Sequence, residues 1–217
     1  KKFISRMGVA YPMTQPLQTL VDQALRDSRW DMTYLAMQVV IEGLALAAFG
    51  NIRDMAKNPL AQQVNAYVME DESRHVAFGR LTLKEFYPQL TQAERDEREE
   101  FLVEACYHMR DRFEARELYS HLGLPVDKIV DAQRESDFQK HFRTMLFQRI
   151  VPIVRDIGLW SDKIQSAYAD MGVLGYATAN YEALAADDEE KAREIDEINR
   201  RKREDYVGSV AALGAAE

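Results

Sequence analysis

The sequence predicts an all-α protein, because long segments with helical periodicity follow one another and no segment has the pattern of a strand. Over strand length, no run alternates apolar and polar residues with enrichment in β-branched side chains. The six prolines and ten glycines lie mostly between the periodic segments, where they end helices. With 217 residues, 47% of them hydrophobic, the chain is long enough to bury a core as one domain of ordinary size.

The first three expected helices cover residues 16–87. Residues 16–29 form a short helix with proline in its first turn, and residues 30–55 form a second helix that contains the most apolar part of the chain. The third runs over residues 58–87, because Asn58 can cap a helix at its start and Pro88 stops it at its end.

Two longer helices and a short one are expected next. Residues 91–121 open with Thr91 and Glu94 in the spacing of a capping box and end at a glycine and a proline. Residues 127–156 form the fifth helix, and a shorter sixth begins at Ser161.

The composition changes near residue 185. The segment DDEEKAREIDEINRRKRED alternates charges at helical spacing, which is typical of a solvated helix or a tail. We therefore expect a helical bundle over residues 1–184 and a charged helical or flexible tail over residues 185–217.

The overall charge excludes some partners. Lys and Arg total 28 against 36 for Asp and Glu, so the net charge is 28 − 36 = −8, and nucleic acid is not an expected partner. Cys106 is the only cysteine, which excludes an internal disulfide and fits a reducing, cytoplasmic location.

Membrane association and export are not expected either. The apolar window at residues 35–50 is too short for an ordinary bilayer span and is interrupted by Gln38 and Glu42, so it predicts a buried helix. The chain begins with lysine and has no apolar run typical of a signal peptide, so we expect its true start to lie upstream.

Charged residues interrupt the apolar faces of the second and third helices. In the stretch DESRH, Glu72 and His75 fall on the inner stripe of the third helix, and Glu42 shares its face of the second helix with apolar residues. A buried carboxylate without a partner costs several kcal/mol. A divalent metal between the two helices would bind these carboxylates and a neutral histidine nitrogen. Two alternatives remain, a hydrogen-bonded core histidine and pairing of the carboxylates with Arg74, Arg110 or Arg143.

The pattern IEGLALAAFG, followed about thirty residues later by VMEDESRHVAFG, resembles the ferritin-like diiron carboxylate superfamily. That superfamily includes the ribonucleotide reductase small subunit and bacterial diiron oxidases and oxygenases. The resemblance covers mainly residues 30–87. It implies that Glu42 is the lone glutamate ligand of one helix and that Glu72 and His75 form the Glu-x-x-His motif of the next. It also implies that Asp71 hydrogen-bonds a metal-bound histidine and orients it.

The sequence departs from the superfamily by carrying half of this ligand set. The other glutamate and the other Glu-x-x-His come earlier in superfamily chains, but no glutamate or histidine precedes Trp30. The expected fold is thus a ferritin-like bundle that lacks its first two metal-ligand helices, as the carboxyl-terminal part of a longer protein. As an alternative, Glu104 and His108 on the fourth helix could supply ligands, although such pairs are usually surface contacts.

The resemblance implies a non-haem diiron oxidoreductase with two iron ions, or manganese and iron, that uses O2 to hydroxylate, desaturate or otherwise oxygenate an organic substrate. The expected pocket walls are mostly apolar and favour an apolar or aromatic substrate; they are Gln38, Val39, Ala45, Phe49, Val68 and Gly79. The electron donor is not encoded, and a homodimer is expected by analogy alone. Amine N-oxygenases of the superfamily add a histidine one turn before the second motif, where this chain has Val68, which argues against that subgroup.

Two other classes of function are consistent with the sequence. One is an iron-handling protein of the ferritin type, which the long additional helices from Thr91 onward disfavour. The other is a metal-free helical scaffold, in which Glu42 and Glu72 belong to a buried ion-pair network.

Overall fold

The computed structural model describes residue 8 and residues 13–214, with side chains described up to residue 207. Every regular element among these residues is helical, which confirms the all-α prediction. The elements are α2 (Gln15–Arg26), α3 (Trp30–Tyr34), the π-helix η1 (Leu35–Ile41), α4 (Glu42–Met55), α5 (Pro59–Phe86), η2 (Tyr87–Gln89), α6 (Gln92–Asp111), η3 (Arg112–Glu114), α7 (Arg116–His121), α8 (Val126–Glu135), α9 (Asp137–Met145), α10 (Ile150–Asp156), α11 (Asp162–Asp170), η4 (Leu174–Thr178) and α12 (Tyr181–Gly214).

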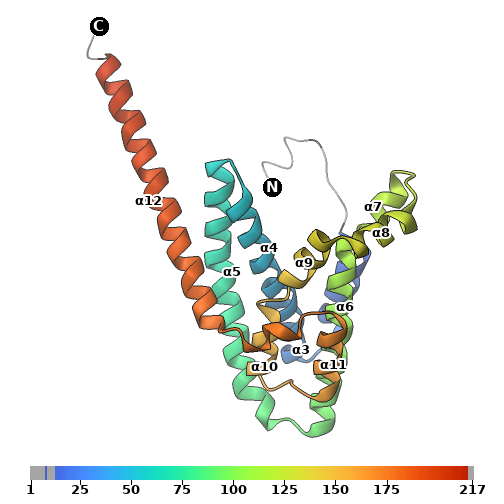
Figure 1. The fold of residues 1–217 in the computed structure, drawn as a ribbon. Helices are drawn as coiled ribbons and strands as arrows, with labels where there is room; N and C mark the ends of the chain where they lie inside the picture. Colours follow the sequence, from blue (N-terminus) through green and yellow to red (C-terminus); the bar gives the residue numbers. More distant parts are fainter. Residues whose placement is uncertain (1–7, 9–12, 215–217) are drawn as a thin grey trace.

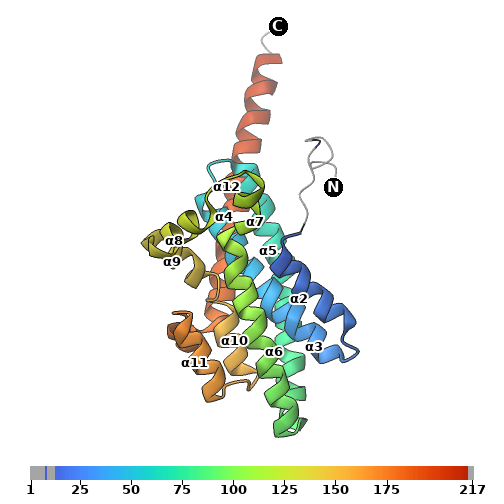
Figure 2. The ribbon, with the colours of Figure 1, turned by 90° about the vertical axis from the view of Figure 1, so that its right-hand side faces the viewer.

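The centre of the fold is the antiparallel pair of α4 and α5 (Figure 1). α12 lies along α5 and continues past the end of the bundle, while α2, α3 and α6 lie on the other side (Figures 1 and 2). α10 packs against both η1 and α5. This arrangement leaves one side of the α4–α5 pair without a covering helix among the described residues.

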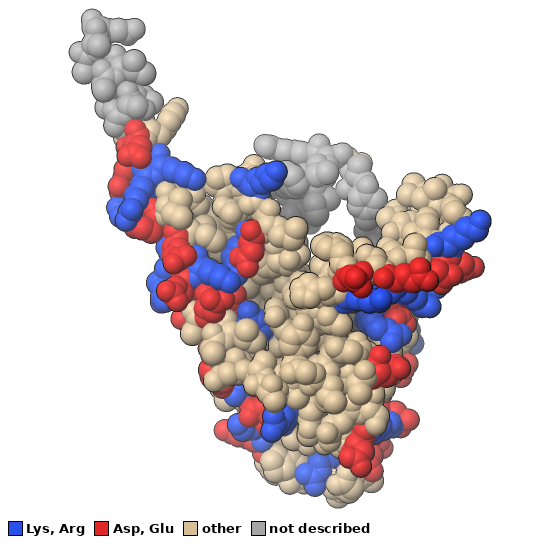
Figure 3. Space-filling view, viewed as in Figure 1, with Lys and Arg blue, Asp and Glu red and all other residues tan. Residues whose placement is uncertain are grey.

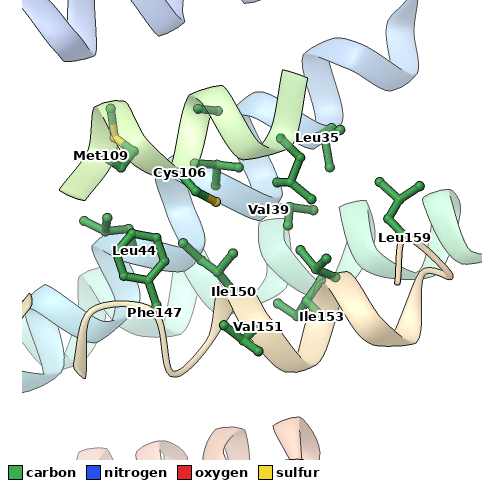
Figure 4. Close-up of a cluster of buried hydrophobic side chains, with 14 of the residues drawn as sticks. Leu35, Val39, Leu44, Cys106, Met109, Phe147, Ile150, Val151, Ile153 and Leu159 are labelled. Carbon is green, nitrogen blue, oxygen red and sulfur yellow. The ribbon is translucent and has the colours of Figure 1, made fainter. Parts of the chain in front are cut away.

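The hydrophobic core lies between η1, α4, α6 and α10 (Figure 4). Leu35 and Val39 from η1 meet Cys106 from α6 and Ile150 and Ile153 from α10, and all five are fully buried. Burying a side chain of the size of leucine or isoleucine stabilises a fold by about 1.5–3 kcal/mol. The core therefore holds η1 firmly against α6 and α10.

Two predicted helix starts are confirmed. The Asn58 side chain accepts a hydrogen bond from the backbone N–H of Leu60 at the start of α5. At the start of α6, Thr91 and Glu94 form the expected capping box. Both caps bind backbone N–H groups that have no partner within the helix.

Two predicted helices are broken in the structure. The helix expected over residues 91–121 ends at Asp111, and the chain turns at Ala115, whose φ of 52° is left-handed. The helix expected over residues 127–156 is divided into α8, α9 and α10. Extended backbone at Ser136 ends α8 and begins α9, and Pro152 has no N–H to continue a helical hydrogen-bond ladder through residues 146–149.

The charged segment from residue 185 is part of α12, which begins at Tyr181. Its first turns contact α5 and α4, since Asp196 accepts hydrogen bonds from Tyr67 and Gln63, and Asp188 pairs with Arg53. Helix α12 is thus attached to the bundle by ionic and polar contacts.

The continuous run Trp30–Met55 is long and apolar enough to cross a membrane by length and composition, and its most apolar 18-residue window has a mean hydropathy of 1.6. Half of its most apolar window is buried in the bundle. A core helix of a soluble protein passes the same test, so the run is weak evidence for a span.

Candidate metal centre

Three predicted ligands come together across the α4–α5 pair. Glu42 is the first residue of α4, and Glu72 and His75 lie one turn apart in the middle of α5. The Nδ1 atom of His75 lies 3.3 Å from Oε2 of Glu72 and 4.0 Å from Oε1 of Glu42. One ligand atom from each residue lies within 4.8 Å of the others. The group has the donor types of a divalent-cation site.

A π-helical segment directly precedes Glu42. η1 spans Leu35–Ile41, and the backbone N–H of Glu42 donates to the carbonyl of Met37, five residues earlier. Such wide turns are rare and often occur at functional sites. The sequence predicts an unbroken α-helix here, and its apolar pattern contains no signal that would reveal the π segment.

Helix α5 approaches η1 very closely at Gly79. A β-carbon on this glycine would lie 2.6 Å from Cβ of Gln38, so a larger residue would force the two helices apart. Gly79 is one turn beyond His75 on α5, and Gln38 is one turn before Glu42. The close approach therefore keeps the histidine and the two carboxylates next to one another.

The surroundings of Glu42 disfavour the charged form of its carboxyl group. Burial, and secondly the charge of Glu72, raise the pKa of Glu42, while His75 acts in the opposite direction. Its Oε2 atom is buried and has no hydrogen-bond partner among the described residues. An unsatisfied buried polar atom costs about 1–3 kcal/mol. A metal ion bound by Oε2 would remove this cost and the repulsion from Glu72, so these residues fit a metal ligand set.

Arginine does not provide the balancing charge for Glu42 within the described chain. Each of the three arginines considered from the sequence has its closest acids elsewhere: Arg74 with Glu70 and Asp71, Arg110 with Asp111, and Arg143 with Glu114. The alternative of a buried ion-pair network around Glu42 and Glu72 is therefore not supported by any of these three arginines.

The cluster lies at the surface of the described chain. The side chain of His75 is 59% exposed, whereas those of Glu42 and Glu72 are 20% and 26% exposed. The prediction that His75 lies on an inner face is thus wrong for this part of the molecule, because the described elements do not cover that face of α5. Phe78 and Ile52 are also exposed.

Asp71 lies outside the cluster. Its side chain is three-quarters exposed and accepts a hydrogen bond of 2.9 Å from Nη1 of Arg74. His75 is the one predicted histidine ligand, and its Nδ1 atom lies beside Glu72 and Glu42 rather than beside Asp71. The expected hydrogen bond from a ligand histidine to Asp71 is therefore not formed within the described chain.

Two of the residues expected to line a substrate pocket are packed inside the described part of the chain. Val39 is fully buried in the core, and Gly79 is buried against Gln38. Five cavities along the described chain are lined by other residues than the six predicted ones, which are Gln38, Val39, Ala45, Phe49, Val68 and Gly79. The prediction from helix faces did not account for how tightly η1 and α5 pack.

Glu104 and His108 form a surface pair on α6. The Nε2 atom of His108 lies 3.5 Å from Oε1 of Glu104, and both side chains are partly exposed. The pair belongs to no group of three potential metal ligands among the described residues. It has the geometry of a helix-stabilising contact between residues four apart.

One comparison with known proteins gives a match. The family model described as p-aminobenzoate N-oxygenase AurF matches residues 1–158, more than two thirds of the chain. The matched part contains Glu42, Glu72 and His75, whereas α11 and α12 lie beyond it. No curated protein and no solved structure gives a match.

The family match corrects one prediction from the sequence. Val68 was expected to argue against the amine N-oxygenases, but valine at this position does not separate the chain from a family described by that activity. The superfamily resemblance is confirmed by the same match. The chain belongs to the family of p-aminobenzoate N-oxygenase AurF, which are diiron oxygenases of the ferritin-like superfamily.

Proposed function

We propose that the protein is a non-haem diiron oxygenase that uses O2 to oxidise an apolar or aromatic organic substrate, with Glu42, Glu72 and His75 among the iron ligands. The family match supports an oxygenase that contains iron. The assignment of the ligands rests on one observation, which is the partnerless buried Oε2 of Glu42 beside two further donor groups.

The chain's own residues would hold and orient the metal. Glu42 and Glu72 provide negative oxygen ligands, and His75 provides a neutral nitrogen when it is not protonated. When bound, iron supplies the activation of O2 that amino-acid side chains cannot provide. Gln38 has a buried Oε1 atom without a partner among the described residues, which can accept a hydrogen bond from a donor near the ligands.

A complete centre of this superfamily needs more ligands than this cluster supplies. Four helices contribute a glutamate from each of two and a Glu-x-x-His from each of the other two, and the cluster contains one of each. We propose that the remaining ligands come from a further helical part of the whole protein. Such a part would cover the open face that carries His75 and Phe78.

An aromatic amine is the first substrate class to test. The family description names p-aminobenzoate, which carries an amine on an aromatic ring. Aromatic side chains border the open face, since the rings of Tyr34 and Phe78 lie 5.8 Å apart and Trp30 packs on Tyr34. Aromatic surfaces of this kind favour an aromatic ligand over a highly charged one.

The family match supports an oxygenase over iron storage, and the lack of an arginine partner for Glu42 weakens the scaffold alternative. We also propose a reducing, cytoplasmic environment, because Cys106 is the single cysteine. Whether the metals are two irons or manganese and iron, and whether the protein is a homodimer, stay predictions.

The test is a metal count on the protein encoded by the intact gene, purified under its native metal supply. We expect about two iron ions, or one iron and one manganese, per chain. The double variant Glu72→Ala with His75→Ala should lose most of this metal. Its matched control is Glu104→Ala with His108→Ala, which removes the same residue types from the surface of α6 and should keep the metal.

Oxygen consumption then tests the substrate class. Metal-loaded protein with a reductant should consume O2 faster when p-aminobenzoate is added than when benzoate, which has no amine, is added. Equal rates would contradict the arylamine proposal but leave the diiron centre intact. No bound metal in the unmodified protein, or metal retained in the Glu72 and His75 variant, would overturn the site assignment itself.

A further inference from the structure

A second site of unusual charge lies away from α4 and α5. A cavity of about 380 Å³ opens between the end of α6, α8, α9 and the chain after α11. Its charged lining residues are Arg110, Glu114, Arg134, Lys140, Arg143 and Asp170. None of the elements that carry them contains Glu42, Glu72 or His75, so this cavity is separate from the candidate metal centre.

The cavity concentrates positive charge in an acidic protein. Four basic residues and two acidic residues line it, which gives a local formal charge of 4 − 2 = +2, whereas the whole chain has −8. In Figure 3, Lys and Arg side chains gather below a row of acidic ones on the right of the molecule, where α8 and α9 lie in Figure 1. A concave surface with excess positive charge attracts anions.

Glu114 is a buried carboxylate in the cavity wall that binds two arginines. Its side chain is 4% exposed and accepts hydrogen bonds of 2.7 Å from Nε of Arg134 and 2.9 Å from Nε of Arg116. Burial alone would raise the pKa of Glu114, but the hydrogen bonds from Arg134 and Arg116 outweigh it and the pKa is lowered. Each oxygen of the Glu114 carboxylate therefore already accepts a hydrogen bond from one of those two arginines.

Arg143 is left without a hydrogen-bonded partner. Its side chain is only 15% exposed, and its nearest carboxylate oxygen, Oε1 of Glu114, lies 3.8 Å from Nη1, which is too far for a hydrogen bond. Arg110, which also lines the cavity, donates through Nε to Oδ1 of Asp111 at 2.6 Å, while its Nη1 lies 3.9 Å from Oδ2 of Asp170, too far for a hydrogen bond. The guanidinium of Arg143 has five N–H donors, and a ligand in the cavity can accept hydrogen bonds from them.

We infer that this cavity binds an oxyanion, a carboxylate or phosphate group, through Arg143 with Arg110 and Lys140. A planar guanidinium can donate two parallel hydrogen bonds to either kind of group. Phe147, Met171 and Val173 are buried apolar side chains in the wall, which suits an anionic group attached to an apolar body. Residues 170–173 lie outside the part of the chain that matches the family model.

Titration calorimetry on the protein encoded by the intact gene tests this inference, with inorganic phosphate and benzoate as separate probes in a chloride-free buffer. Arg143→Gln should weaken binding by about ten- to a hundredfold, because a charge-assisted contact is lost. The control Arg26→Gln removes the same charge from an exposed position on α2 and should leave the affinity unchanged.

A second variant keeps the test decisive if Arg143→Gln fails to fold, which a melting curve would reveal. Asp170→Asn removes a negative charge from an exposed side chain at the cavity and should tighten binding severalfold. Binding of phosphate alone, of benzoate alone or of both, with these opposite effects, supports the inference and identifies the anion class. No binding of either probe, or the same affinity in all variants, would overturn it.

Discussion

Two carboxylates on the same long helical run, Trp30–Met55, have opposite surroundings. Asp31 is paired with Arg98 of α6, whose Nε lies 2.9 Å from Oδ2 and whose Nη2 lies 3.3 Å from Oδ1, and both side chains are almost fully buried. Glu42 faces Glu72 and His75 instead, with one oxygen that lacks a partner among the described residues.

The difference separates a structural contact from a candidate binding site. Where an arginine reaches the carboxylate, the charge is balanced inside the protein and the pair joins α3 to α6. Where a second carboxylate and a histidine reach it and no arginine does, a bound metal ion can balance the charge. Changes at the first place should therefore affect stability, whereas changes at the second should affect metal binding.

The largest expected effect is at the paired site. Arg98→Ala leaves the buried Asp31 without its cation and should lower the free energy of unfolding by about 3–5 kcal/mol. Urea denaturation followed by circular dichroism measures this loss. Replacing both residues, as Asp31→Leu with Arg98→Met, should recover much of the stability, and a double variant as unstable as the single one would contradict this account.

The next largest effect is at the close approach of α5 to η1, beside the candidate metal ligands. Gly79→Ala places a β-carbon 2.6 Å from Cβ of Gln38 and should destabilise the protein by about 1–3 kcal/mol. Metal content should fall as well, because η1 and α5 must separate. Gly175→Ala is the matched control, since a β-carbon there meets nothing within 4 Å. Equal melting temperatures for the two variants would count against the role of Gly79.

The third prediction concerns the pH dependence of the ion pairs that join α5 to α10. Asp156 accepts hydrogen bonds of 2.7 Å from Lys84 and 2.6 Å from Arg80. Burial acts to raise the pKa of Asp156, but the hydrogen bonds from Lys84 and Arg80 outweigh it and the pKa is lowered. A lowered folded-state pKa means that the pair stabilises the protein above the unfolded pKa of about 3.9.

This stability should be lost as the pH falls through the lowered folded-state pKa of Asp156. Asp156→Asn should cost about 1 kcal/mol at neutral pH and almost nothing at pH values below that pKa. Urea denaturation of both proteins at a series of pH values checks the expected convergence. A stability difference that stays constant down to the lowest pH would show that the carboxylate charge is not responsible.

The smallest expected effect is at the unpaired site, in metal-free protein. Glu72→Gln removes one of two facing carboxylates and should change the free energy of unfolding by about 0.5 kcal/mol or less, toward greater stability. Glu104→Gln should act in the opposite direction by about 0.2–0.5 kcal/mol, because it breaks the contact with His108. A loss above about 1 kcal/mol for Glu72→Gln would assign that residue a structural ion pair.

Local features of the fold could be predicted well from the sequence. The caps at Asn58 and Thr91 and the full length of α5 follow from short-range patterns, and the structure confirms them. The breaks at Ala115 and Ser136 could not be predicted in this way. Ala115 adopts a left-handed conformation in the turn where Glu114 bonds two arginines, one of them twenty residues later in the chain.

The sequence predicted which residues belong to the candidate site, but it did not predict how exposed they are or which side chains they contact. The spacing of Glu72 and His75 places them on one helix face, and the inward position of Glu42 follows from its apolar neighbours. The exposure of His75 and the pairing of Asp71 with Arg74 depend on which faces other helices cover. The same is true of Val39, which packs into the core and does not line a pocket.

By itself, the sequence determined the helical class, most helix starts and the shared helix face of Glu72 and His75, because caps and periodic patterns act over a few residues. Tertiary structure decided that Glu42 lies within ligand distance of Glu72 and His75, that a π-helix precedes it, and that Arg98 rather than a metal balances Asp31. Those outcomes depend on side-chain packing between segments far apart in the chain, and no local pattern encodes the distance between them.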